Sequence, residues 1–358
     1  MALALSLGRR GQGRCWPNPA VGCVIVKDGV IVGRGWTQPG GRPHAEPVAL
    51  AQAGDAARGA TAYVTLEPCS HYGKTPPCAL ALIEAGVARV VAAIEDSDPR
   101  VSGQGFEMLR DAGIEVTTGV MAEEAARDLE GFFLKTEQGR PFVTLKLASS
   151  FDGRIATGSG HSQWITGPQA RRVVHAMRAR HDAVMVGAGT ARADDPSLTV
   201  RDLGMEYQPV RVVVSRHLDL PLMSQLARTA KDVPLWLCHG QGADSERIRA
   251  WDGIGAKLLP CNLHGVQLDP TDILAQLGAE GLTSVFCEGG SALAATLLAH
   301  DLVDELVGFT AGVTIGAEGL PALGALGVGR LEEAPRFQLV DSRPVGPDIL
   351  HRWRRTTS

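Results

Sequence analysis

The stretch TLEPCSHYGKTPPCALALIEAG, Thr65 to Gly86, joins a strand to a helix through a loop bounded by two cysteines. Residues 60–68, ATAYVTLEP, are typical of a strand and end at a proline, which cannot donate to a sheet. Residues 76–86, PPCALALIEAG, begin with proline and end with glycine, as helices commonly do. Cys69 and Cys78 therefore lie at the two ends of a strand-to-helix connection, and each follows a proline.

Strands and helices alternate on both sides of this stretch, which predicts an α/β layer fold. A hairpin is expected over 21–36, where Lys27-Asp28-Gly29 supplies the turn. In the first half we expect helices at 44–54, 105–113 and 121–139, and strands at 88–96 and 114–120.

The pattern restarts at EQGRPF (137–142), where Gly139 and Pro141 interrupt it. We therefore predict two domains, 1–139 and 140–358, consistent with a length of 358 residues. In the second half we expect helices at 167–181 and 291–300, and strands at 142–150, 182–189, 209–215, 233–240, 284–288 and 303–313.

Composition narrows the class of protein. A net charge of −4 argues against a dedicated nucleic-acid binder, which usually has a basic face. Seven scattered cysteines do not form an evident disulfide framework, so a reducing cytoplasm is expected. The first residues lack a basic leader and a cleavage site, and no run of 18 apolar residues occurs, so neither a signal peptide nor membrane association is expected.

One histidine and two cysteines have the chemistry of a catalytic zinc site, which uses three protein ligands and leaves a fourth position open. Cys78 falls in the first turn of its predicted helix, where the helix dipole favours the thiolate. His44 stands at the start of another helix, and Glu46 could then move a proton from water to a departing amine. His-x-Glu followed by two cysteines, one of them in Pro-Cys, is the pattern of zinc deaminases.

Two other interpretations of these residues stay open at this point. They could be buried core residues without a metal, or they could hold a structural zinc with His71 as the fourth ligand. The loop SHYGKTPP (70–77) is longer than the two residues that usually separate the cysteines. Its Lys74 suits a phosphate, although exposed loops are often only solvated.

Several motifs in one order resemble a single family. PNPAVGCVIVKDG (17–29), HAE (44–46) and TLEPCSHYGKTPPC (65–78) resemble the pyrimidine deaminase of riboflavin biosynthesis. Four motifs of the second half resemble the reductase of the same pathway. They are LKLASSFDGRIA (145–156), SQWITG (162–167), RARHDAVMVGAGTARADDPSLTVR (178–201) and CEGGSALAATLL (287–298). The resemblance covers nearly the whole chain, which is identified as a member of the bifunctional bacterial deaminase–reductases.

The resemblance implies a cytidine-deaminase-like three-layer α/β/α domain followed by a dihydrofolate-reductase-like α/β domain. The first would hydrolyse an amino group from 2,5-diamino-6-ribosylamino-4(3H)-pyrimidinone 5′-phosphate with the help of zinc. The second would use NADPH to reduce the ribosyl group of 5-amino-6-(5-phosphoribosylamino)uracil to ribityl. The expected partner is thus a small phosphorylated pyrimidine, with neither nucleic acid nor membrane, while a homo-oligomer is left open.

Carried over by position, the metal ligands are His44, Cys69 and Cys78, and Glu46 is the proton shuttle. Contacts with the deaminase substrate would come from Asn18, His71 and Lys74. Thr37 occupies the place where the family usually has a histidine, so one substrate contact is either lost or supplied by another residue.

In the reductase half, the resemblance places the NADPH phosphates on Gly290, Ser291, Ala292, Leu293, Ala294, Ala295 and Thr296, with further cofactor contacts from Ala148, Trp164, Thr190 and Asp194. It places the substrate on Ser162, Arg178, Leu198, Arg201 and Glu288. A Gly-Gly turn before a helix can bring backbone N–H groups close to a phosphate, although most such turns only reverse the chain.

Lys146 is our own addition to this set. It lies in an apolar strand, where a lysine either extends outward or points into a site. We predict that it polarises the ribose carbonyl or donates a proton during reduction.

Two competing hypotheses are weighed against the two-step enzyme. One is a zinc deaminase of another base or nucleotide with a non-catalytic C-terminal domain. The other is a non-catalytic zinc protein that binds RNA or a protein partner. The complete set of motifs in both halves and the presence of Glu46 favour the two-step enzyme.

Overall fold

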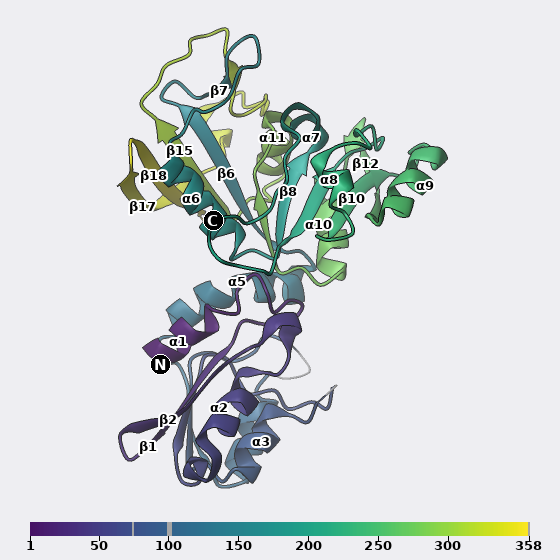
Figure 1. Ribbon diagram of the computed structural model, residues 1–358. Coiled ribbons are helices and arrows are strands. Elements are labelled where there is room, and N and C mark those ends of the chain that lie inside the picture. The colour runs from purple at the N-terminus through teal and green to yellow at the C-terminus, as the bar shows by residue number, and fades with distance from the viewer. Residues whose placement is uncertain (74, 99–101, 357–358) are drawn as a thin grey trace. The chain divides into compact units, whose positions relative to one another are not determined.

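The structure is a computed structural model that describes residues 1–73, 75–98 and 102–356. The chain divides into two compact units (Figure 1). The first contains Met1–Arg140 with Gly281–Thr283, and the second contains Pro141–Glu280 with Ser284–Ser358. Both units are built from alternating helices and strands, as the sequence pattern predicts.

The first unit is a five-stranded sheet with helices on its two faces. Its strands are β1 (Gly22–Lys27), β2 (Val30–Trp36), β3 (Thr61–Val64), β4 (Arg89–Ala92) and β5 (Glu115–Thr117), in the order β2-β1-β3-β4-β5. Its helices are α1 (Ala2–Gly8), η1 (Pro39–Gly41), α2 (Ala45–Ala53), η2 (Gly54–Ala57), α3 (Cys78–Glu84), α4 (Gln104–Asp111) and α5 (Ala122–Gln138).

Alternation along β1 divides the hydrophobic residues of the first unit between the two faces of the sheet. On one face, Cys23 and Ile25 join the core formed with α2, α3 and α4. On the other face, Val24 packs against Ala4 and Leu7 of α1. The result is a three-layer α/β/α arrangement in which α2 and α3 lie on the same side of the sheet.

Two glycines of β2 allow α2 to approach the sheet closely. A Cβ on Gly33 would stand 2.2 Å from the carbonyl oxygen of Ala49, and one on Gly35 would stand 2.0 Å from that of Ala45. No side chain fits at either distance, so glycine is required there for steric reasons. These contacts fix the N-terminus of α2 against the sheet, and His44 is the residue that precedes it.

The second unit is built on a nine-stranded sheet of order β11-β10-β9-β8-β14-β6-β15-β18-β17, in which the strands from β11 to β15 are parallel. Its strands are β6 (Phe142–Ser150), β8 (Ala183–Gly187), β9 (Val210–Val214), β10 (Leu235–Gly240), β11 (Lys257–Cys261), β14 (Ser284–Cys287), β15 (Glu305–Ala311), β17 (Phe337–Val345) and β18 (Asp348–Arg355). Two short pairs lie outside this sheet: β7 (Arg154–Ala156) with β16 (Leu320–Pro321), and β12 (Leu263–His264) with β13 (Gln267–Leu268).

The helices of the second unit are α6 (Pro168–Arg178), α7 (Ala188–Asp194), α8 (Gln225–Arg228), α9 (Ser245–Ile254), α10 (Pro270–Ala279), α11 (Ser291–Ala299) and η3 (Leu331–Glu333). Helix α6 packs on β14, β15 and β18 through Val174, which contacts a cluster that includes Phe286 and Phe309. A second cluster, which includes Val186 and Trp251, fills the space between the β8–β10 region and α9.

Most predicted elements are present, but the strands are shorter than expected. The residues expected as a strand at 60–68 form β3 only over Thr61–Val64, because the following residues turn away towards Cys69. The hairpin turn is Asp28-Gly29, with φ of 49° and 76°, since Lys27 still pairs with Val30. The C-terminal hairpin β17–β18 was not predicted, although its strands pair along most of their length.

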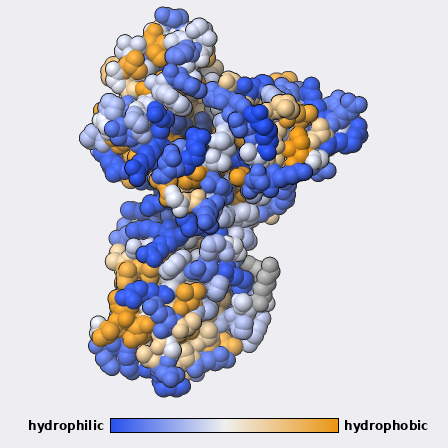
Figure 2. All heavy atoms as spheres, viewed as in Figure 1, coloured by the Kyte–Doolittle hydropathy of each residue, from blue (hydrophilic) through white to orange (hydrophobic). Residues whose placement is uncertain are grey.

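No helix within the described residues is long and apolar enough to cross a membrane. Hydrophobic side chains that face solvent occur in small groups on the visible face of the first unit, near α1 and the β1–β2 hairpin (Figure 2). Leu3 and Val30 are exposed members of these two elements.

Candidate functional sites

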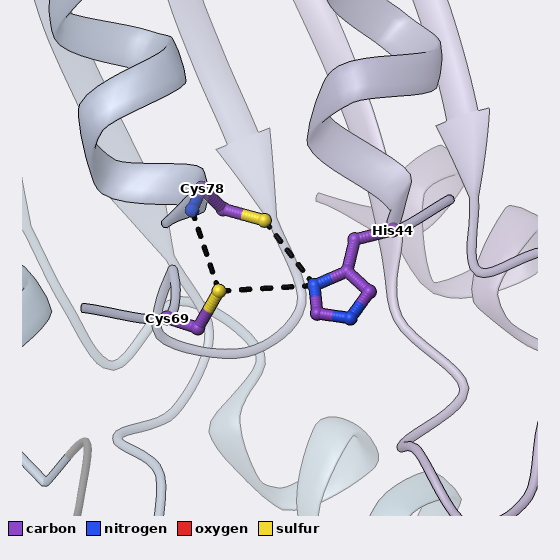
Figure 3. A group of neighbouring side chains, drawn as sticks. All are labelled: His44, Cys69 and Cys78. Atoms are coloured by element: carbon purple, nitrogen blue, oxygen red, sulfur yellow. Dashed lines mark hydrogen bonds between the residues drawn. The ribbon is translucent and has the colours of Figure 1, made fainter. Parts of the chain in front are cut away.

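Three side chains of the first unit converge in the way that the sequence predicts for a metal site (Figure 3). The donor atoms of His44, Cys69 and Cys78 all lie within 4.8 Å of one another. Nδ1 of His44 is 3.3 Å from Sγ of Cys78 and 3.7 Å from Sγ of Cys69. His71, the alternative fourth ligand, does not belong to the group found among the described residues.

The local fold explains why these three atoms meet. His44 caps the N-terminus of α2, and Cys78 is the first residue of α3, so two helix N-termini face the same point. Cys69 lies in the loop that follows β3 and accepts a hydrogen bond from the backbone N–H of Cys78 at 3.3 Å. Both the helix dipoles and this N–H favour negative charge on sulfur.

The donor set fits zinc. Zn–S bonds of about 2.3 Å and Zn–N bonds of about 2.0–2.1 Å in a tetrahedron separate neighbouring ligands by about 3.3–3.8 Å. The two nitrogen–sulfur distances of 3.3 and 3.7 Å fall in that range. One imidazole and two thiolates also leave a fourth tetrahedral position for water or substrate, as in catalytic zinc sites.

Without a metal, the electrostatics of the site favour the ligand form of Cys69 alone. The hydrogen bond with Cys69, and then burial, raises the pKa of the Cys78 thiol. Hydrogen bonds from the side chains of Cys78 and His44 lower the pKa of the Cys69 thiol to about 4, although burial opposes the shift. The hydrogen bond with Cys69 raises the pKa of His44, and burial opposes this shift, with a smaller opposing effect from the charge of Arg42. Cys69 is therefore disposed to be a thiolate at neutral pH.

Glu46 lies in the first turn of α2 and is only 3% exposed. Burial, and secondarily the negative charge of Cys69, raises the pKa of its carboxyl group to about 7. A carboxyl group with such a pKa can both accept and release a proton near neutral pH.

The predicted substrate residues of this unit differ in how closely they approach the group formed by His44, Cys69 and Cys78. Nδ2 of Asn18 donates to the carbonyl oxygen of Gly41 at 2.8 Å and lies 3.1 Å from Nε2 of His44. Asn18 therefore contacts a proposed ligand directly, on the side of the ring opposite the sulfur atoms. His71 stands beside Gly73, and its buried Nδ1 has no hydrogen-bond partner among the described residues. Lys74 lies outside the described residues.

Two residues near this group were not found by sequence reasoning. The carboxylate of Glu67 accepts hydrogen bonds from backbone N–H groups, including those of Gly103 at 3.0 Å and Gly105 at 2.8 Å, and so ties the Cys69 loop to the start of α4. Glu67 stands in the quoted TLEPC motif, where an acidic residue next to proline would have been the only signal. Arg42, two residues before His44, donates to the hydroxyl of Thr75 in the loop between the cysteines.

In the second unit, Glu288 joins two of the predicted residues. It follows β14, and its carboxylate pairs with Arg178 of α6 and lies 3.9 Å from Nζ of Lys146 on β6. Burial lowers the pKa of Lys146, and the charge of Glu288 opposes the shift. Burial would raise the pKa of Glu288, but Arg178 and then Lys146 lower it overall. Lys146 therefore points into a charged cluster rather than outward to solvent.

The turn that is predicted to bind a phosphate, Gly289-Gly290, has a backbone conformation that favours glycine. Gly289 and Gly290 have φ of 81° and 90°, and Gly290 caps the N-terminus of α11. A Cβ on Gly290 would stand 2.9 Å from Oγ1 of Thr190, so these two predicted cofactor residues are neighbours. The open backbone N–H groups at this helix start suit an anionic phosphate.

The other predicted cofactor residues spread over several elements. The first two turns of α11 hold Ser291, Ala292, Leu293, Ala294, Ala295 and Thr296, of which Ala294 and Ala295 are buried. Ala148 lies on β6 and packs against the α6 cluster. Asp194 ends α7. Burial raises the pKa of its carboxyl group, and the charge of Lys146 opposes this shift. Trp164 is 69% exposed and stacks on Arg171, with 4.4 Å between the guanidinium carbon and the ring centroid.

The remaining predicted substrate residues lie in two loops. Arg201 donates from Nη1 to the Ser197 hydroxyl at 3.1 Å, and its backbone N–H donates to His175 on α6. The Leu198 side chain is buried in a core cluster, so only its backbone could meet a ligand. Ser162 stands two residues before Trp164 in the segment between β7 and α6.

Each of the two units matches the model of a known protein family. The model of the cytidine and deoxycytidylate deaminase zinc-binding region matches residues 1–94. The model of the RibD C-terminal domain matches residues 141–351, more than half of the chain.

Similar proteins match this chain over nearly their full length. The riboflavin biosynthesis protein RibD of Escherichia coli (strain K12) is 44% identical over 98% of this chain and 97% of that protein. The corresponding protein of Aquifex aeolicus (strain VF5) is 41% identical over 99% of this chain and 97% of that protein. Among solved structures, RibD of Acinetobacter baumannii has a TM-score of 0.88 at 38% identity, covering 99% of this chain and 98% of that one.

A Thermotoga maritima structure has a TM-score of 0.86 at 36% identity, covering 99% of this chain and 97% of that one. That protein is described as a diaminohydroxyphosphoribosylaminopyrimidine deaminase/5-amino-6-(5-phosphoribosylamino)uracil reductase.

Proposed function

Because the chain belongs to the RibD family of bifunctional deaminase–reductases, we propose that its two reactions take place at the two residue groups described above. The chain is a riboflavin biosynthesis enzyme with a zinc-dependent pyrimidine deaminase domain and an NADPH-dependent reductase domain. The cytidine-deaminase-like and dihydrofolate-reductase-like folds expected from the sequence are confirmed. We place the domains at 1–139 and 140–358, because α5 ends at Gln138 and β6 begins at Phe142.

In the deaminase site, we assign His44, Cys69 and Cys78 as zinc ligands. Zinc held there would supply a Lewis acid that lowers the pKa of a water molecule. Glu46 takes a proton from water and delivers it to the departing amino group, so that a C–O bond forms, a C–N bond breaks and ammonia leaves. The observation that carries this assignment is the buried Glu46 carboxyl group, with a pKa of about 7, beside three converging ligand atoms.

Asn18, His71 and Lys74 are proposed to bind the substrate of this site. The side-chain amide of Asn18 also contacts Nε2 of His44, the ring nitrogen that does not face the sulfur atoms, and can fix the orientation of the ring. The unpartnered Nδ1 of His71 has hydrogen-bonding capacity left for a ligand.

In the reductase site, Lys146, Arg178 and Glu288 form the centre of the proposed arrangement. NADPH supplies the hydride that converts the ribosyl group to ribityl. Lys146 is proposed to donate the matching proton to the sugar oxygen, since burial brings its pKa closer to neutral. Glu288 orients Lys146 and Arg178 by pairing with both.

The groups around this centre are proposed to hold the two ligands. Gly290 to Thr296, with Ala148, Trp164, Thr190 and Asp194, would bind NADPH, and the glycine turn at α11 supports a phosphate there. Arg178, Arg201, Ser162, Leu198 and Glu288 would bind the sugar phosphate. Arginine suits this task because its planar guanidinium matches phosphate oxygens.

The cellular setting is also a proposal. None of the seven cysteines, all of which the structure describes, forms a disulfide, which supports a reducing compartment such as the cytoplasm. The net charge of −4 supports a small-molecule enzyme without nucleic-acid or membrane partners.

We propose a homo-oligomer as well, because the edge hairpin exposes Leu339 and Val340 on β17 and Ile349 on β18. Light scattering of the purified chain tests this last point.

The two-site assignment is tested with the full chain, zinc and the diaminopyrimidine ribosylamino phosphate. Ammonia release is followed first without NADPH, and NADPH oxidation is followed after its addition. We expect ammonia without NADPH, and NADPH oxidation only after ammonia has been released. NADPH oxidation by the undeaminated substrate would contradict the proposed order, and ammonia without any later NADPH oxidation would contradict the reductase assignment.

A further inference from the structure

The loop that leads into α2 brings an arginine, Arg42, to the deaminase site. Arg42 is half-buried, and it comes two residues before the proposed ligand His44. Its Nη1 donates to the hydroxyl of Thr75, which lies in the loop between the two proposed cysteine ligands. The structure assigns Arg42 no carboxylate partner among the described residues, so its charge is not neutralised by an ion pair there.

Arg42 and His71 approach the same point from two different segments. The position that a Cβ on Gly73 would occupy is 3.3 Å from Nη2 of Arg42 and 3.9 Å from Nε2 of His71. A Cβ at this point would crowd Nη2, so the absence of a side chain at Gly73 lets the guanidinium approach this loop beside His71. Nη2 has no hydrogen-bond partner among the described residues, and neither does Nδ1 of His71.

We infer that Arg42 binds the phosphate of the deaminase substrate together with His71 and so determines specificity for the phosphorylated form. A guanidinium with one N–H bonded to Thr75 still offers N–H groups for a charge-assisted bond to phosphate oxygen. The inference rests on the proposed function, since it takes the substrate of this site to carry a 5′-phosphate.

Thr37, in the same connection as Arg42, is not available to a ligand. Its side chain is only 1% exposed. Its hydroxyl accepts from the backbone N–H of Val21 at 3.0 Å and is used within the fold. Thr37 therefore cannot reach a ligand, whereas Arg42, five residues later in the same connection, can supply a cationic contact.

The test compares the phosphorylated substrate with the same riboside after removal of the phosphate, using full-length zinc-loaded enzyme. The readout is the ratio of the two kcat/KM values for ammonia release. For Arg42→Gln we expect this ratio to fall about 10- to 100-fold, mostly through KM, because one hydrogen bond to a charged group is lost. For Arg42→Lys the ratio should fall less, since lysine keeps the positive charge but lacks the planar, bidentate guanidinium. Inorganic phosphate should inhibit Arg42→Gln more weakly than the wild type.

Two control variants separate phosphate binding from a structural role. Arg34→Gln removes an exposed arginine of β2 and should leave the ratio unchanged. Thr75→Val removes the loop contact of Arg42 but keeps the guanidinium. If Arg42 only held that loop, Arg42→Gln would lower both kcat/KM values equally, Thr75→Val would do the same, and the inference would be overturned.

An unchanged ratio in Arg42→Gln would also overturn it. Failure of the proposed function is recognised separately, because the wild type would then release no ammonia from either substrate.

Discussion

Nδ1 of His44 lies 3.3 Å from Sγ of Cys78, although 33 residues separate the two in the sequence. Each stands at the N-terminus of a helix, and both helices lie on the same side of the sheet. The metal group is thus a consequence of how α2 and α3 pack. Two of the three proposed ligands stand at the starts of helices that pack on the core, which suits a site that must keep one coordination position open.

The first prediction concerns the metal itself. Cys78→Ser should reduce the zinc content of the purified chain from one equivalent to near zero, because a serine hydroxyl does not replace a thiolate ligand. Elemental analysis after dialysis measures this content. Cys261→Ser is the matched control, since Cys261 is buried in the other unit, where its thiol donates to the carbonyl oxygen of Leu259. Equal zinc in both variants would remove Cys78 from the ligand set.

A second prediction follows from the close approach of α2 to β2. Gly35→Ala places a methyl group 2.0 Å from the carbonyl oxygen of Ala45, which neither backbone can accommodate without a shift. We expect a loss of about 1–3 kcal/mol in the free energy of unfolding and weaker zinc binding, because the N-terminus of α2 moves. Thermal unfolding and zinc titration measure these effects.

The control for Gly35→Ala is Gly253→Ala in α9, where nothing lies within 4 Å of the new methyl group. That change should stabilise the chain by about 0.5–1 kcal/mol through helix propensity. If the two variants had the same stability, the steric role of Gly35 would be refuted.

The sequence predicted much of this architecture from local signals. Proline before Cys78 and glycine after its helix define α3, and the Asp28-Gly29 turn defines the β1–β2 hairpin. His44, Glu46, Cys69 and Cys78 were identifiable because their chemistry is written in short motifs. The relation of Gly35 to Ala45 was not predictable, since it depends on a distance between two elements and not on either pattern.

Other features were missed for similar physical reasons. The C-terminal hairpin has mixed polar and apolar residues because most of β17 faces solvent, which weakens its periodicity. Glu67 and Arg42 act through contacts with residues more than 30 positions away, so their neighbours in the sequence give little indication of their roles. Thr37 was recognised as a departure, but its burial against Val21 could be learned only from the fold.

A third prediction tests Lys146 in the reductase. Lys146→Ala should leave ammonia release intact and lower the rate of NADPH oxidation about 10²- to 10⁴-fold, the usual contribution of general acid catalysis. In the wild type, the rate of NADPH oxidation should fall as rising pH deprotonates Lys146. Because burial lowers the pKa of Lys146, this fall should begin below the pH at which an ordinary lysine titrates. Lys257→Ala, at an exposed pair with Glu280, serves as the control. Full NADPH turnover by Lys146→Ala would exclude Lys146 from the mechanism.

A fourth prediction uses the pH dependence of stability. The pKa of Glu288 is lowered in the folded chain, because Arg178 and Lys146 outweigh the effect of burial. Its ion pairs therefore contribute stability that is complete above the ordinary carboxyl pKa of 4.5 and is lost as the pH falls through the lower folded value. The stability difference between the wild type and Glu288→Ala should shrink from pH 6 towards pH 3 in denaturant titrations. A difference that stays constant over this range would show that the ion pairs do not contribute.

The most direct test of the account is the zinc content and ammonia release of Glu46→Gln, with Glu84→Gln on the exposed side of α3 as the control. If Glu46 moves the proton and does not bind the metal, the variant keeps one zinc per chain and ammonia release falls by about 10²- to 10⁴-fold. The control should match the wild type in both measurements. Ammonia release at the wild-type rate, or loss of zinc from Glu46→Gln, would contradict the central claim that this buried carboxylate is the proton shuttle beside a His–Cys–Cys zinc site.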